Sequence, residues 1–224
     1  MLTQAIQLFQ NGNIEAAEIS LKRILQVDKN NLPGLHVLGL IKASQKNFPE
    51  AAKLLERAAK ISPDDASIRY NLAMALMDAG ELRGSLPHHK RSVELSPKNP
   101  EAWLNYGRVQ SKLLDYENAI NCYDQALNIN PKFIEALVNK GITLRQLRRF
   151  EEALDLADEA LAINPNFVEA ILNKGLALQG LGKYDESQIY YDKVLSQNPE
   201  HVEAVFNKAI SLHAQKKFEE ALNY

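Results

Sequence analysis

The chain has 224 residues, of which 46% are hydrophobic and 24% charged, and its formal net charge is −2. Acidic and basic side chains nearly balance, which excludes a global field that would hold the protein on nucleic acid or on an acidic membrane. The single cysteine, Cys122, excludes an intrachain disulfide framework and fits a reducing compartment.

The N-terminal stretch carries no basic leader and no long apolar core, so it does not have the pattern of a signal peptide. Apolar residues alternate with polar ones at helical spacing along the chain, so we expect no segment that spans or lies on a membrane. Together with the lone cysteine, these features predict a cytoplasmic protein.

Several residue series recur with a step of 34 residues. Five prolines follow it: Pro63, Pro97, Pro131, Pro165 and Pro199. Small residues follow it at two further positions, in the series Gly39, Ala73, Gly107, Gly141, Gly175 and Ala209, and in the series Ala17, Ala51, Ser85, Ala119, Ala153, Ser187 and Ala221. A fixed period of this length indicates a helical solenoid.

Taken in chain order, the step divides the sequence into repeats at 1–31, 32–65, 66–99, 100–133, 134–167 and 168–201, with a partial repeat at 202–224. Each repeat shows two apolar stripes at helical spacing, and in 100–133 a turn at Leu114–Asp115 separates them. Proline blocks continuation of the second helix. Small residues let paired helices approach closely. We therefore predict 1–224 as a single array of antiparallel helix pairs.

In the repeat 66–99, the segment Arg83–Lys90 departs from this pattern. Pro87 falls where the second helix should already run, and His89 takes the position held by Leu55, Tyr123 and Tyr191 in other repeats. We expect this helix to start late, with Ser85 as its N-cap and Pro87 in its first turn, where proline is harmless. The alternative is a bend or a contact site.

The order of Trp103, Gly107, Ala119, Tyr123, Ala126 and Pro131 resembles the tetratricopeptide repeat (TPR) family, and the resemblance extends over the whole chain. There are departures, since Tyr106 and Gln110 replace the usual Leu and Tyr, and lysines occupy the usual Leu position at Lys140, Lys174 and Lys208. The resemblance implies an all-α fold, a right-handed superhelical solenoid of antiparallel helix pairs. The pattern is cut at Tyr224 without a capping helix, so we expect a piece of a longer chain, the alternative being a frayed natural end.

Catalytic and metal-binding patterns are missing. The histidines (36, 88, 89, 201 and 213) are scattered, and no third or fourth ligand stands out beside His88, His89 and Cys122. The cluster of Arg145, Arg148 and Arg149 is followed by Glu151 and Glu152, so we interpret it as a solvated turn. We therefore expect no enzyme activity in this chain, no metal and no cofactor.

One repeated polar residue is not obviously demanded by packing: the series Asn71, Asn105, Asn139, Asn173 and Asn207. The resemblance implies that the first helix of each repeat lines a concave groove, where carboxamides can hold a peptide backbone, as in the asparagine ladder of O-GlcNAc transferases. The alternative is that each Asn bonds within its own helix pair. Further predicted groove residues are Tyr70, Met74, Leu104, Arg108, Val138, Ile142, Leu172, Leu176, Phe206 and Ile210.

We interpret the chain as a protein-interaction scaffold that binds an extended or helical peptide in this groove, with possible self-association through its uncapped C-terminal end. The lysines of the chaperone-tail type of TPR are missing at the matching positions, Tyr70, Leu104 and Val138. The rival interpretation is an acceptor-recruiting arm of a glycosyltransferase, because the N-terminal stretch resembles TPR arrays of bacterial O-GlcNAc-transferase-like enzymes. RNA binding is a third alternative, which the lack of a basic excess disfavours.

Overall fold

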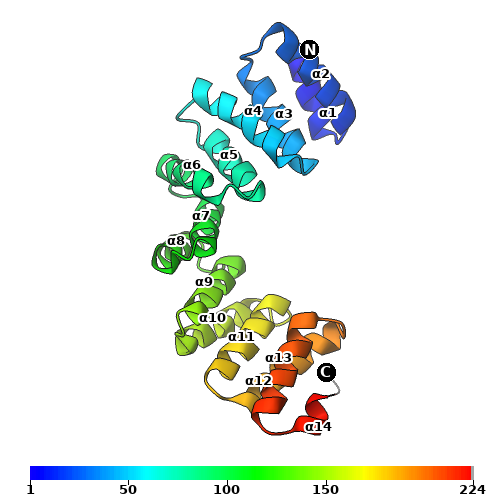
Figure 1. Cartoon of the computed structure of the whole chain (residues 1–224). Helices are drawn as coiled ribbons and strands as arrows, with labels where there is room; N and C mark the ends of the chain where they lie inside the picture. Colours follow the sequence, from blue (N-terminus) through cyan, green and yellow to red (C-terminus); the bar gives the residue numbers. More distant parts are fainter. Residues whose placement is uncertain (223–224) are drawn as a thin grey trace. The chain divides into compact units, whose positions relative to one another are not determined.

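The computed structural model describes residues 1–222 (Figure 1). These residues form helices only, joined by short turns. The helices are α1 (Leu2–Gln10), α2 (Ile14–Val27), α3 (Leu32–Ser44), α4 (Phe48–Ile61), α5 (Ala66–Asp78), α6 (Leu82–Leu95), α7 (Pro100–Lys112), α8 (Tyr116–Ile129), α9 (Ile134–Gln146), α10 (Phe150–Ile163), α11 (Val168–Gly180), α12 (Tyr184–Gln197), α13 (Val202–Ala214) and α14 (Phe218–Ala221). The predicted all-α solenoid is confirmed; the expected cut at Tyr224 lies outside the described residues.

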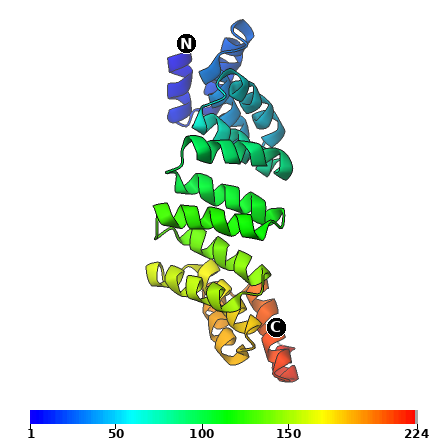
Figure 2. The ribbon, with the colours of Figure 1, turned by 90° about the vertical axis from the view of Figure 1, so that its left-hand side faces the viewer.

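The chain divides into two compact units, Met1–Leu113 and Leu114–Tyr224, here called unit 1 and unit 2. In unit 1 each helix from α1 to α6 packs against the next, and α1, α3, α5 and α7 also contact one another in succession. In unit 2 the same holds from α8 to α14, and α9, α11 and α13 form the row of first helices. Figure 2 shows the helices of each unit stacked side by side.

The turn within each helix pair requires one residue in the left-handed backbone region, and these residues lie 34 apart. Glycine provides it at Gly12, Gly80 and Gly182, with φ values of 77°, 85° and 75°. At the other four turns a residue with a side chain adopts the same conformation: Lys46, Leu114, Arg148 and Lys216. The backbone geometry therefore repeats even where the sequence lacks the glycine that this geometry favours.

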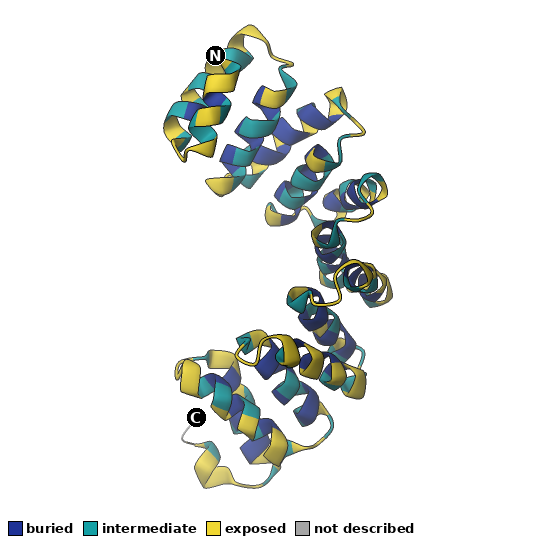
Figure 3. Cartoon of the chain, turned by 180° about the vertical axis from the view of Figure 1, so that it is seen from behind, coloured by how far each residue is buried: buried dark blue, intermediate teal, exposed yellow. Residues whose placement is uncertain are grey.

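Alanines and branched apolar residues fill the surfaces between helices. Ala17, Ala51, Ala119 and Ala153, from the 34-residue series, are fully buried. Gly175 shows why small residues recur on the first helices, because a Cβ at this position would lie 2.7 Å from the ring of the buried Tyr191. In Figure 3 the buried positions follow the faces by which the helices of each unit meet.

The helix α6 corrects one prediction. It begins at Leu82, with Glu81 as N-cap, and Pro87 lies inside it. Ser85 is not the cap: its hydroxyl donates to the Leu82 carbonyl at 2.8 Å. A proline inside a helix loses one backbone hydrogen bond, but α6 is held on both sides by α5 and α7. Tertiary packing therefore maintains the helix through the position where local preference predicted a delayed start.

Candidate functional site

In unit 1, two asparagines of the predicted groove bond to the preceding repeat. The Asn71 Nδ2 lies 2.8 Å from Nε2 of His36, on α3. The Asn105 amide donates to the Tyr70 hydroxyl at 2.9 Å and to the carbonyl of Glu101 at 3.0 Å, and its oxygen accepts from the Arg108 guanidinium at 3.0 Å. With 7% of its surface exposed, Asn105 is part of a side-chain network that joins α5 to α7. These contacts favour the structural alternative for both residues.

In unit 2, the three asparagines differ in their surroundings. Asn173 is 2% exposed; its amide donates to the Val138 carbonyl at 3.4 Å, and its Oδ1 is buried without a hydrogen-bond partner among the described residues. It packs on Gly141, where a Cβ would come within 2.7 Å of its Nδ2. Asn139 and Asn207 are half-buried, and each donates to the carbonyl four residues earlier in its own helix. Only these two keep a side chain that a partner could reach.

The apolar residues predicted for the groove divide in the same way. Leu104, Val138 and Leu172, each preceding an Asn, are buried. Residues one turn later are more open, because the next repeat does not cover them: Ile142 is 36% exposed and Ile210 39%. Phe206 on α13 is 62% exposed. Tyr70, Met74, Arg108 and Leu176 are half-buried.

Each first helix of unit 2 presents three residues at i, i+4 and i+7, which fall on one side of a helix. We call these positions the unit 2 face: Val138, Ile142 and Arg145 on α9, Leu172, Leu176 and Gln179 on α11, and Phe206, Ile210 and His213 on α13. The first two residues of each set are apolar and the third is polar. The face therefore combines an open apolar row with a polar border.

Arg145 corrects the prediction of a solvated arginine cluster. Arg148 is exposed, and Arg149 pairs with Glu152 at 2.6 Å, as a turn would allow. Arg145, however, is largely buried, and its Nε has no partner among the described residues. Burial lowers the pKa of its guanidinium, and the charges of Glu203 and Tyr191 oppose this shift. The sequence gave no signal of this, because the shielding comes from other helices.

A second buried titratable group lies in the irregular repeat of unit 1. His89 is 0% exposed, stacks on Tyr106 with 6.1 Å between ring centroids, and has no hydrogen-bond partner for either ring nitrogen among the described residues. Burial, with a smaller contribution from His88, lowers the pKa of His89 to about 4. The imidazole is therefore neutral at physiological pH and occupies a position that Leu or Tyr fills elsewhere.

The lysines that follow the asparagines have a packing role that sequence reasoning missed. Lys140 lies 2.6 Å from Asp124, and Lys208 lies 2.5 Å from Asp192; Lys174 pairs with Asp158 in the same way. Each pair joins a first helix to the second helix before it, across a spacing of 16 residues. A constant distance between lysine and aspartate in three successive repeats could have revealed it.

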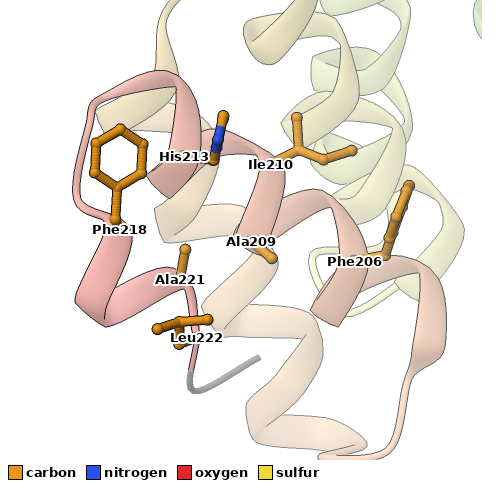
Figure 4. A pocket seen from close by; sticks show the side chains of 7 residues that line it. All are labelled: Phe206, Ala209, Ile210, His213, Phe218, Ala221 and Leu222. Carbon is orange, nitrogen blue, oxygen red and sulfur yellow. The ribbon is translucent and has the colours of Figure 1, made fainter.

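An apolar pocket lies beside α13 and α14. It has a volume of about 450 Å³ and is lined by Phe206, Ala209, Ile210, His213, Phe218, Ala221 and Leu222. Figure 4 shows Phe218 on the far side of the His213 ring from Ile210 and Phe206. His213 and Phe218 meet edge to face, with 5.1 Å between centroids.

Two searches of residues 1–222 limit other functions. Within this range no group of three or more His, Cys, Asp or Glu side chains is arranged to hold a metal ion. No helix in the same range combines the length and the apolar character that crossing a bilayer requires. Cys122 is a buried free thiol whose pKa burial raises to about 12, which makes it a poor nucleophile.

Stacked antiparallel helix pairs with a period of 34 residues define a helical-repeat protein. Sequence models described as tetratricopeptide repeat match residues 42–86, 100–133, 134–167 and 172–224. The chain belongs to the TPR family. The unmatched residues 87–99 fall largely in α6, the irregular helix.

Similar proteins include N-alpha-acetyltransferase 16, NatA auxiliary subunit, of Mus musculus, which is 25% identical over 114 residues, 51% of this chain and 13% of that protein. The chain thus matches only a small part of this relative. Among solved structures, a tetratricopeptide repeat protein from Parabacteroides merdae has a TM-score of 0.77 at 22% identity, covering 86% of this chain and 76% of the other. YrrB, described as a TPR protein with an unusual peptide-binding site, has a TM-score of 0.69 at 17% identity, covering 88% and 97%.

Proposed function

We propose that the chain is a non-catalytic scaffold that binds a peptide segment of a partner protein along its first helices, chiefly on the unit 2 face. The observation that carries this proposal is the row of exposed apolar side chains at Ile142, Phe206 and Ile210. Exposed apolar residues that recur on one side of successive helices are typical of a partner site. YrrB, which shares the fold, is described by its own peptide-binding site.

The asparagines enter this proposal unequally. Asn139 and Asn207 are the members of the series with accessible side chains, and their carboxamides could hydrogen-bond a peptide backbone beside the apolar row. Asn71 and Asn105 would act through the network that fixes the unit 1 helices, and Asn173 through its packing on Gly141. We also propose that 1–224 is one repeat array, because the 34-residue step continues through residue 113, and that it works in the cytoplasm.

The test is a selection with the whole chain immobilised and a displayed library of random peptides. Peptides enriched on the wild type should bind at least tenfold more weakly to the double variant Ile142→Ser, Ile210→Ser, since a fully buried apolar side chain contributes about 1.5–3 kcal/mol. The matched control is Ile189→Ser, an isoleucine on α12 that is also exposed but lies off the unit 2 face. Equal losses in both variants would refute binding on this face.

A second candidate is self-association through the apolar pocket of α13 and α14. The exposed Phe218 and Leu222 favour it, because apolar pockets of this size attract complementary surfaces. In sedimentation velocity, the wild type should show a concentration-dependent dimer that Phe218→Asp abolishes. A monomer at every concentration would exclude this candidate and leave peptide binding unaffected.

A further inference from the structure

Arg145 differs from every other arginine that is shielded from solvent. Five such arginines have a hydrogen-bond acceptor within the described residues: Arg57 the Lys29 carbonyl, Arg69 the Pro63 carbonyl, Arg91 the Asp64 carboxylate, Arg108 the Asn105 oxygen and Arg149 the Glu152 carboxylate. Arg145 has neither a hydrogen bond nor an ion pair with any residue in 1–222. A desolvated guanidinium without an acceptor costs free energy, so its presence calls for an explanation.

The position of Arg145 points to a ligand. It follows Ile142 by three residues on α9, on the same side of the helix. This helix packs against α11, and α11 packs against α13, where Phe206 and Ile210 are exposed on the equivalent side. The cation therefore borders the apolar row that is the proposed peptide site.

Neighbouring polar groups do not satisfy Arg145. The Tyr191 hydroxyl donates instead to the Gln179 Oε1 at 2.5 Å. Glu203, at the start of α13, contributes a favourable charge but lies beyond ion-pair distance. The Nε is already buried, so further acceptors must come to the outer nitrogens of the guanidinium. A carboxylate that binds two of these nitrogens would form the strongest type of hydrogen bond available to arginine.

We propose that Arg145 anchors an aspartate or glutamate of the bound segment, so that the partner carries an acidic residue next to the apolar residues that cover the unit 2 face. This inference rests on the proposed peptide binding and specifies the chemistry of the partner. An apolar segment with an acidic residue is then favoured over a basic or purely apolar one. The stability given up by leaving Arg145 without an acceptor is recovered when the carboxylate binds.

The experiment uses the whole chain and a displayed library of random peptides of about 16 residues, long enough for roughly four helical turns. The strongest enriched peptide is then synthesised with its acidic residue and with Gln in that place, and both are titrated against the wild type and Arg145→Gln. Arg148→Gln is the matched control, because Arg148 is exposed three residues further on. Thermal unfolding of each variant is recorded in parallel.

We expect acidic residues to be enriched among the binders. Either change, in the protein or in the peptide, should weaken binding about tenfold, and the two together no more than one alone, which marks a direct pair. Arg145→Gln should unfold at the same or a higher temperature, while Arg148→Gln should bind like the wild type. The inference is overturned if binders lack an acidic residue or bind Arg145→Gln unchanged. Peptide binding itself would then stand, provided that Ile142→Ser, Ile210→Ser still weakens it; a library without any binder would refute both proposals.

Discussion

Units 1 and 2 use the same repeat positions for different purposes. In unit 1 the first helices carry His36, Tyr70 and Arg108, which bond to the asparagines of the next or the same repeat. In unit 2 the corresponding side is an open apolar row that ends at Arg145. The two arginines show the difference most directly, because Arg108 has an acceptor on its own helix and Arg145 has none in 1–222.

This difference indicates how a repeat fold separates stability from recognition. The residues that set the fold recur with the period, as at Gly39 and Gly175, where a Cβ would collide with Leu55 and Tyr191 respectively. The residues on the exposed side of the first helices are not fixed in this way, because they contact no conserved neighbour. One unit can therefore close this side with hydrogen bonds while the other leaves it open for a partner.

The largest predicted effect tests the two units by pH. The pKa of His89 falls from an ordinary value near 6.5 to about 4 on folding. Stability from the neutral imidazole is complete above pH 6.5 and is lost as the pH falls toward 4, by up to about 3 kcal/mol. Burial also lowers the pKa of His36 and His88, both in unit 1, and adds to the same trend.

Hydrogen exchange of the whole chain at pH 7 and pH 5 should therefore show protection falling first in α5, α6 and α7. His89→Leu restores the apolar residue found at position 55 and should remove most of this pH dependence. If α11 and α12 lost protection before α6, or if His89→Leu kept the wild-type pH profile, acid sensitivity would not originate at His89.

Much of the fold could be predicted from the sequence, because the 34-residue series of prolines and small residues is produced by packing that every repeat shares. The error at α6 has a physical cause. Pro87 was judged by local helix preference, whereas contacts with α5 and α7 determine the outcome. The site was less accessible: Asn105 bonds to Tyr70, 35 residues earlier, and Arg145 is shielded by later repeats. Periodicity predicts which positions are equivalent but not which atoms meet.

An intermediate effect compares two asparagines at the same repeat position. Asn105→Ala should lower the free energy of unfolding by about 1–3 kcal/mol, because the Arg108 guanidinium loses its acceptor and the Tyr70 hydroxyl its donor. Asn207→Ala removes only a bond to the Glu203 carbonyl on its own helix and should change stability by less than about 0.5 kcal/mol. Urea unfolding followed by circular dichroism measures both. Equal losses would mean that the asparagines have one common role in the two units.

The smallest predicted effect concerns the turns, where the two units share a backbone but differ in residue type. Gly80 in unit 1 and Leu114 in unit 2 occupy equivalent left-handed positions, with φ values of 85° and 65°. Leu114 is 70% exposed, so its side chain gains little from packing while its backbone is strained. Leu114→Gly should therefore raise stability by about 1 kcal/mol, and Gly80→Ala should lower it by a similar amount. The shift in urea midpoint measures both changes. If Leu114→Gly were destabilising, Leu114 would have to contribute contacts in solution that outweigh its backbone strain, and the turns of the two units could not be treated as equivalent.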